Sequence, residues 1–153
     1  KQIETTDKSE VKPMRKYLIA THGELAKGFQ SSLNILADKG NDFQVINAYI
    51  IDEDYTPAID EFIASVQPEE QGFIFTDLFG GSVNQKAFTE LMNAKKDNIV
   101  IITNANLAVI LSVLFLGGDE ALSLEQIQQA VSESQVQVVP TQIADEDDDS
   151  IFD

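Results

Sequence analysis

The sequence contains no cysteine, no tryptophan and only one histidine among its 153 residues. Without cysteine the chain forms no disulfide, no thiolate zinc site and no cysteine nucleophile. No segment reaches the roughly 20 consecutive apolar residues of a membrane-spanning helix. The nearest, residues 107–116, is shorter and is typical of a buried helix. The chain starts with charged and polar residues instead of the apolar segment of a signal peptide. We therefore expect a cytoplasmic protein.

Basic residues are also scarce, because 10 Lys and Arg face 26 Asp and Glu and leave a formal net charge of −16. This charge argues against a nucleic-acid partner, since phosphate binding requires a basic surface. An anionic membrane surface is disfavoured for the same reason, whereas a basic protein would be attracted at low salt. The acidic run 145–149 together with Asp153 is typical of a solvated, disordered tail.

The length and composition predict one globular domain between two short flanking segments. We expect a flexible leader, or a cloning remnant, over residues 1–13, a globular domain over residues 14–140 and an acidic tail over residues 141–153. The sequence shows no internal repeat and no second domain.

Within the globular part, short apolar segments alternate with segments of helical periodicity. Continuous apolar runs predict buried parallel strands, and apolar residues spaced three or four apart predict helices. We expect strands over residues 17–20, 43–51, 72–76 and 98–103, and helices over residues 25–36, 56–66, 83–91, 107–116 and 124–131. Residues 135–139 alternate and predict a half-exposed or edge strand. This order predicts an α/β fold, a doubly wound and mostly parallel sheet with helices on both faces.

The candidate site lies at the ends of the predicted strands. His22 ends the first strand, Asp77 follows the third and Asn104 follows the fourth. Because the carboxyl ends of parallel strands meet at one edge, where open α/β sheets bind ligands, we expect these side chains and Thr21 to gather there. A neutral imidazole attacks phosphorus through one nitrogen if the other is held as a donor. A carboxylate that accepts this hydrogen bond fixes the tautomer.

Gly80, Gly81 and Ser82 follow Asp77 and begin a predicted helix. The free N–H groups and the dipole of a helix N-terminus favour an anion, and the Ser82 hydroxyl adds a donor. Together these residues predict a phosphohistidine site that requires neither nucleotide nor metal. We expect His22 and Asp77 to react, and Thr21, Gly80, Gly81, Ser82 and Asn104 to surround the phosphoryl group.

Each residue also has a structural explanation. A single histidine is more often structural than catalytic, Asp77 could cap a turn, the glycines could serve the turn itself and Ser82 could be an ordinary N-cap. Other chemistries lack their motifs, because the sequence has no Gly-x-Ser-x-Gly hydrolase elbow and no glycine-rich nucleotide loop. The combination of residues therefore carries the prediction.

These residues resemble the IIA component of the mannose/fructose/sorbose class of the bacterial phosphoenolpyruvate-dependent sugar phosphotransferase system. The matching segments are Leu-Ile-Ala-Thr-His-Gly over residues 18–23, Asp-Leu-Phe-Gly-Gly-Ser-Val-Asn over residues 77–84, and Asn104. The resemblance extends from Met14 to about Val139.

The resemblance implies that His22 accepts a phosphoryl group from the carrier HPr and passes it to a IIB component, here a separate protein, which phosphorylates sugar at the membrane permease. It implies that Asp77 holds the other ring nitrogen and that Ser82 and nearby amides contact the phosphoryl oxygens. The family fold is a doubly wound sheet whose last strand, matched here by residues 135–139, is exchanged within a homodimer.

Three alternatives remain open from the sequence. The chain could be the phosphohistidine subunit that serves a dihydroxyacetone kinase, which shares the fold and the histidine. It could be a regulatory module whose phosphorylation state is read by a transcription activator. It could also be an α/β oligomerisation domain with an incidental histidine.

Overall fold

The structure is a computed structural model, and it describes residues 14–142 of the chain. The leader expected over residues 1–13 and most of the acidic tail, residues 143–153, lie outside the described residues. No helix within residues 14–142 is long and apolar enough to cross a bilayer.

The centre of the fold is a parallel four-stranded sheet with the order β2-β1-β3-β4. The chain moves outward on one side of β1 to form β2 and then crosses to the other side for β3, so that the strand order reverses between β1 and β3. Ala20 of β1 is paired with Thr76 of β3, which places His22 and Asp77 at adjacent strand ends. The strands are β1 (Arg15–His22), β2 (Phe43–Ala48), β3 (Gln71–Thr76) and β4 (Ile99–Ile102).

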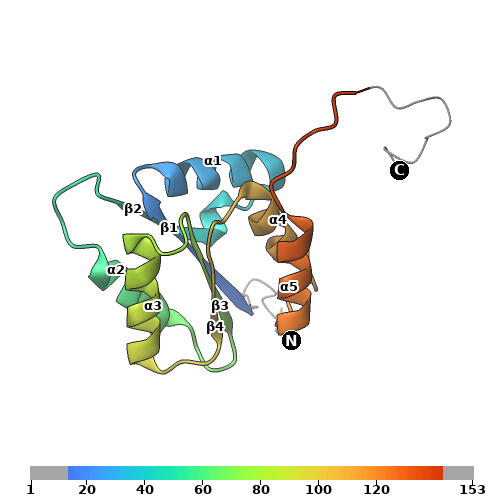
Figure 1. Cartoon of the computed structure of the whole chain (residues 1–153). Helices are drawn as coiled ribbons and strands as arrows, with labels where there is room; N and C mark the ends of the chain where they lie inside the picture. The colour runs from blue at the N-terminus through green and yellow to red at the C-terminus, as the bar shows by residue number, and fades with distance from the viewer. Residues whose placement is uncertain (1–13, 143–153) are drawn as a thin grey trace, which may run out of the picture.

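Helices cover both faces of this sheet (Figure 1). One face packs against α1 (Leu25–Ala37), α4 (Leu107–Phe115) and α5 (Leu124–Glu133), and the other against α2 (Thr56–Ser65) and α3 (Ser82–Ala94). A short 3₁₀ turn, η2 (Gly40–Asp42), joins α1 to β2. The α/β prediction, with a parallel sheet covered on both faces, is therefore confirmed.

The aromatic side chains of the first face form a stacked row under α1 and α4. Tyr17 stacks on Phe43 and on Phe73, with ring centroids 4.7 and 5.8 Å apart. Phe43, Phe73 and Phe75 are almost fully buried. Burying each such ring contributes roughly 1.5–3 kcal/mol, so this row anchors the strands that carry the site.

Arg15 and Asn106 secure the two ends of the apolar helix α4. The buried guanidinium of Arg15 donates to the backbone carbonyls of Val113, Leu116 and Gly118 at the end of the helix. At the start, Asn106 Oδ1 accepts from Val109 N at 2.8 Å, and its Nδ2 donates to the carbonyl of Ser134 at 2.6 Å. The helix that the sequence predicted without a polar face is thus capped at its start by its own N-cap residue and at its end by a side chain of β1.

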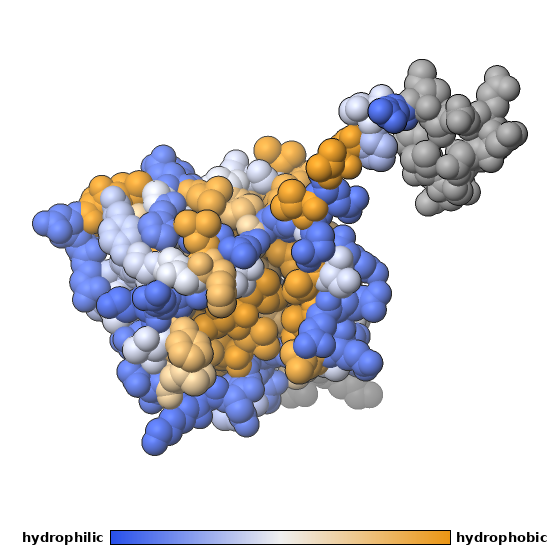
Figure 2. Space-filling view, in the orientation of Figure 1, coloured by the Kyte–Doolittle hydropathy of each residue, from blue (hydrophilic) through white to orange (hydrophobic). Residues whose placement is uncertain are grey.

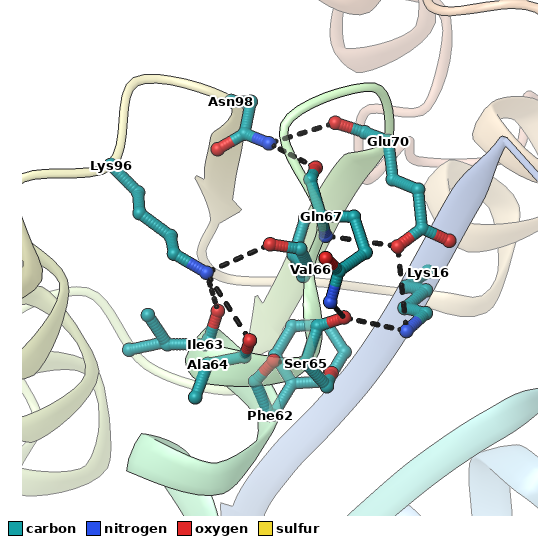
Figure 3. A network of polar contacts seen from close by, with 10 residues as sticks. All are labelled: Lys16, Phe62, Ile63, Ala64, Ser65, Val66, Gln67, Glu70, Lys96 and Asn98. Carbon is teal, nitrogen blue, oxygen red and sulfur yellow. Dashed lines mark hydrogen bonds and ion pairs between the residues drawn. The ribbon is translucent and has the colours of Figure 1, made fainter.

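A cluster of polar residues lies at the amino end of the sheet, and we call Lys16, Glu70, Lys96 and Asn98 the basal network (Figure 3). Lys96 Nζ donates to the carbonyls of Ile63 and Val66 at 2.6 and 2.8 Å, at the end of α2. The other three members bind one another or the backbone of residues 65–70. The network therefore satisfies carbonyls that the helix end leaves unpaired.

Two expected strands differ in the structure. The strand expected to continue to residue 51 ends at Ala48, because Tyr49 adopts a left-handed backbone with φ of 68°. The strand expected over residues 135–139 is not formed, since these residues have no regular structure and extend away from the body of the molecule (Figure 1). Val136 and Val138 are 92% and 94% exposed, and residues 135–139 pair with no strand of the described residues.

One edge of the sheet is open on the side of β4. Within residues 14–142 this strand pairs only with β3, and its Val100 and Ile101 are only partly buried. Figure 2 shows apolar side chains gathered on the face between α3 and α5, where this edge lies. An apolar sheet edge of this kind is a template for a further strand.

Candidate functional site

The candidate site lies at the carboxyl ends of β1 and β3, where the strand order reverses. His22 is the last residue of β1, and Asp77 follows the last residue of β3. Gly23 turns the chain into α1 with φ of 61°, and its N–H donates to the carbonyl of Ala48 at 2.8 Å. This location is the usual ligand site of an open α/β sheet.

Asp77 holds His22 through two hydrogen bonds to one carboxylate oxygen. Its Oδ2 accepts from both the backbone N–H and Nδ1 of His22, each at 2.9 Å. The Asp77 side chain is 9% exposed, whereas the His22 ring is 38% exposed. A carboxylate that accepts from Nδ1 makes this nitrogen the N–H donor, so the lone pair of the neutral ring resides on Nε2.

The environment keeps Asp77 ionised. Burial raises the pKa of Asp77, but the hydrogen bonds from the His22 backbone and ring, and the charge of His22, outweigh it and hold this pKa below the ordinary value of 3.8. A second oxygen, Oδ1, accepts from Leu78 N at 3.1 Å. The carboxylate is therefore positioned and charged at neutral pH.

Nε2 faces the start of α3. Ser82, the first residue of this helix, places its Oγ 3.2 Å from Nε2. No side chain caps the start of α3, and Gly81 occupies the N-cap position. Helix-start N–H groups that lack a cap are suited to bind an anion.

The two glycines bring the loop close to the ring. Gly80 has φ of 75°, a conformation that a side chain disfavours. A Cβ on Gly81 would lie 3.1 Å from the carbonyl oxygen of Leu78 and 3.5 Å from Cε1 of His22. The absence of side chains at these positions therefore lets the start of α3 approach the imidazole.

The other two predicted site residues stabilise the loops around the ring. Thr21 is buried, and its Oγ1 accepts from Ala26 N at 2.7 Å, at the start of α1. Asn104, with φ of 50°, accepts from Phe79 N at 2.8 Å through its Oδ1. The structure thus brings His22, Asp77, Gly80, Gly81 and Ser82 directly together, and it joins Thr21 and Asn104 to the neighbouring loops.

Sequence reasoning missed Tyr49 and Tyr55. The Tyr49 ring stacks on His22 with centroids 5.4 Å apart and an interplanar angle of 24°. Its hydroxyl lies 2.8 Å from Ser82 Oγ and 3.3 Å from the Tyr55 hydroxyl. The sequence did not single out Tyr49, because this residue fell within the strand expected over residues 43–51. His22 and Asp77 were located because ligand-binding side chains lie at the carboxyl ends of parallel strands. The same rule, applied to the end of β2, points to the loop that contains both tyrosines.

Within residues 14–142, no three His, Cys, Asp or Glu side chains gather closely enough to hold a metal ion. The described geometry supplies an oriented imidazole beside hydroxyl and amide donors. Such a group is able to attack an electrophile and then bind the oxygens attached to it.

Comparison with known proteins places this geometry in context. The model of a family described as "PTS system fructose IIA component" matches residues 16–132. A search of curated proteins found no match.

Several solved structures are similar to the chain. One is a putative phosphoenolpyruvate-dependent sugar phosphotransferase system permease from Klebsiella pneumoniae, with 25% identity and a TM-score of 0.67, covering 77% of this chain and 84% of that one. A IIA protein associated with the fucose utilization operon of Streptococcus pneumoniae has 21% identity and a TM-score of 0.65, covering 80% and 92%. The mannose/sorbose-specific IIA subunit from Enterococcus faecalis has 16% identity and a TM-score of 0.60, covering 84% and 98%. The last two show a shared fold.

Proposed function

The chain belongs to the family of phosphotransferase system fructose IIA components, and from this membership we propose that it carries a phosphoryl group on His22 during sugar uptake. In this proposal His22 accepts the phosphoryl group from phosphorylated HPr and passes it to a IIB component. The relay takes place in the cytoplasm, beside the membrane permease.

The observation that carries the proposal is the hydrogen bond between Nδ1 of His22 and Asp77. This bond is 2.9 Å long and leaves the lone pair on Nε2, which faces Ser82 and the start of α3. As Nε2 bonds to phosphorus, positive charge develops on the ring, and the carboxylate stabilises it. The incoming phosphoryl oxygens would then meet the Ser82 hydroxyl and the uncapped N–H groups of α3.

The remaining predicted residues have supporting roles in this proposal. Gly80 and Gly81 permit the close approach of α3 to the ring. Thr21 and Asn104 hold the loops on either side through the hydrogen bonds to Ala26 and Phe79. No cofactor is required, because the donor already carries an activated phosphoryl group.

The first experiment is phosphorylation in vitro. The full chain is incubated with phosphoenolpyruvate, the general donor enzyme of the system and HPr, and ³¹P NMR is used to detect an acid-labile phosphohistidine. We expect the signal in the wild type and its loss in His22→Ala, with circular dichroism as the control for folding. A wild type that stays unphosphorylated, or a His22→Ala protein that is still phosphorylated, would contradict the proposal.

The acceptor is tested in a second step. Phosphorylated protein is mixed with a IIB component and, separately, with a dihydroxyacetone kinase system, and loss of the phosphohistidine is followed. Transfer to IIB supports the sugar-uptake role. Transfer only to the kinase system, or to neither, would overturn it.

We also propose that the protein is a homodimer that exchanges residues 135–139. The exposed Val136 and Val138 alternate as a strand requires, and the partly buried β4 edge offers an apolar surface for a strand from a second copy. Sedimentation analysis should give a dimer for the full chain and a monomer for a chain that ends at Ser134. A monomeric full chain would contradict this proposal without affecting the proposed phosphorylation of His22.

A further inference from the structure

Three hydroxyl groups stand in a row that ends on Nε2 of His22. The distances are 3.3 Å from Tyr55 to Tyr49, 2.8 Å from Tyr49 to Ser82 Oγ and 3.2 Å from Ser82 to Nε2. Each hydroxyl is both a donor and an acceptor, so the row forms a continuous chain of hydrogen bonds. The three hydroxyl groups come from two parts of the fold. Tyr49 and Tyr55 are the first and last residues of the loop between β2 and α2, and Ser82 is the first residue of α3.

The direction of this chain follows from the tautomer of His22. Nδ1 donates its hydrogen to Asp77, so Nε2 is an acceptor and the Ser82 hydroxyl must donate to it. The oxygen of Ser82 is then left to accept from Tyr49, and the oxygen of Tyr49 to accept from Tyr55. All three hydroxyl hydrogens therefore point toward the nitrogen that attacks phosphorus.

The acidity of Tyr55 agrees with the outer link of this row. Burial, and then the hydrogen bond with Tyr49, raise the pKa of Tyr55 above its ordinary value of 10. A hydrogen bond raises the pKa of the phenol that donates it. Tyr55 is therefore the donor toward Tyr49.

The backbone conformation of Tyr49 is energetically unfavourable. Its φ of 68° is unusual for a tyrosine, and its side chain is 60% exposed, so burial does not account for the position. This backbone conformation aims the ring at His22 and the hydroxyl at Ser82. Strained residues of this kind gather at functional sites.

We propose that Tyr49 is a positioning residue of the phosphoryl-transfer site, which fixes the imidazole through its ring and orients the Ser82 hydroxyl through its own. This inference rests on the proposed function of His22. Tyr55 supports Tyr49 from the outer end of the same chain of hydroxyl groups.

The transfer step then proceeds without net movement of a proton. The lone pair of Nε2 forms a bond to phosphorus while the bond between phosphorus and the donor's nitrogen breaks and leaves its electron pair on the donor. The Nδ1 hydrogen stays on His22 and is shared with Asp77. The Ser82 hydroxyl turns its hydrogen from Nε2 to a phosphoryl oxygen. Tyr49 remains hydrogen-bonded to Ser82 Oγ and limits the rotation of this hydroxyl group.

The test compares Tyr49→Phe, Ser82→Ala and the double variant in the phosphorylation assay with HPr. Losing one hydrogen bond should slow transfer at saturating HPr about threefold to tenfold in each single variant, with little change in KM. Because Tyr49 acts through Ser82, the double variant should be no slower than Ser82→Ala alone. Tyr49→Leu removes the stacked ring as well and should be slower than Tyr49→Phe. Tyr17→Phe, the matched control at the remaining tyrosine, should leave the rate unchanged.

A second readout uses the protein without phosphate. The ¹⁵N resonance of His22 Nε2 reports whether its lone pair accepts a hydrogen bond. It should move in the same direction in Ser82→Ala and, to a smaller extent, in Tyr49→Phe, but stay in place in Tyr17→Phe.

These measurements separate failure of the inference from failure of the proposed function. Additive effects in the double variant, or a Tyr49→Phe protein with the rate and the Nε2 resonance of the wild type, would overturn the role of Tyr49 while the phosphohistidine remained. A wild type that accepts no phosphoryl group would overturn the proposed function, and with it the role of Tyr49 in transfer. The Nε2 resonance would still decide whether the hydroxyl chain exists.

Discussion

At the amino end of the sheet the polar side chains bind mainly the backbone, whereas at the carboxyl end a continuous row of side-chain hydrogen bonds runs from Asp77 through His22 to Ser82 and Tyr49. Lys96 and Asn98 of the basal network each donate to two or more carbonyls near the end of α2. Around His22 the bonds join the side chains of His22, Asp77, Ser82 and Tyr49. A group of polar residues is therefore structural when its hydrogen bonds pair the backbone carbonyls around it. It is a candidate for chemistry when an imidazole lone pair and the N–H groups of a helix start remain available to a ligand.

The largest effect is expected from removing the charge at the carboxyl end. Asp77→Asn retains the shape of the side chain but no longer fixes the Nδ1–H tautomer, so phosphoryl transfer from HPr should slow by roughly a hundredfold or more. The measurement is the rate of phosphohistidine formation, with Asp119→Asn, an exposed site, as the matched control. An unchanged rate would remove Asp77 from the mechanism.

Breaking the basal network should affect stability and spare the transfer chemistry. Lys96→Met leaves the carbonyls of Ile63 and Val66 without their charged donor, and should lower the free energy of unfolding by about 2 kcal/mol. Urea unfolding measures this loss, with the exposed Lys27→Met as the control. If Lys96→Met instead slowed transfer in the folded protein, the division between the two ends would be wrong.

The two glycines allow a sharper test at the carboxyl end. Alanine at position 81 would press on Leu78 and approach His22, so we expect transfer to slow about threefold to tenfold. Alanine at position 80 meets no atom within 4 Å but has a disfavoured φ of 75°, so it should cost about 1 kcal/mol of stability. Equal transfer rates in the two variants would show that the close approach at Gly81 has no role.

The smallest effect concerns the pH dependence of stability. The pKa of Asp77 is lower in the folded chain than its ordinary value of 3.8, so its contribution to stability is complete above that value. This contribution is lost as the pH falls through the lower folded pKa. Urea unfolding between pH 2 and 6 should therefore show the wild type and Asp77→Asn converging in acid. A constant difference between them would contradict the shift.

The sequence predicted the sheet and the pairing of His22 with Asp77 for a physical reason. Buried parallel strands are continuously apolar, so the polar residue that ends each one is conspicuous. The sequence did not predict the role of Tyr49, because nothing in the residue type shows that a tyrosine adopts a left-handed backbone. The contact of Lys96 with residues 63–66 joins segments far apart in sequence, which periodicity does not detect. The alternation of residues 135–139 suits a strand, but pairing also requires contact with a sheet edge, and within the described residues this segment extends away from the sheet.

The left-handed backbone of Tyr49 has a consequence for protein engineering. A tyrosine in this conformation costs about 1 kcal/mol or more, and glycine or asparagine at the same position would relieve this cost. A laboratory selection for heat resistance alone would therefore discard Tyr49, whereas under the proposed role of Tyr49 a selection for sugar uptake would retain it. Position 49 is thus where thermostability and fitness are expected to favour different residues.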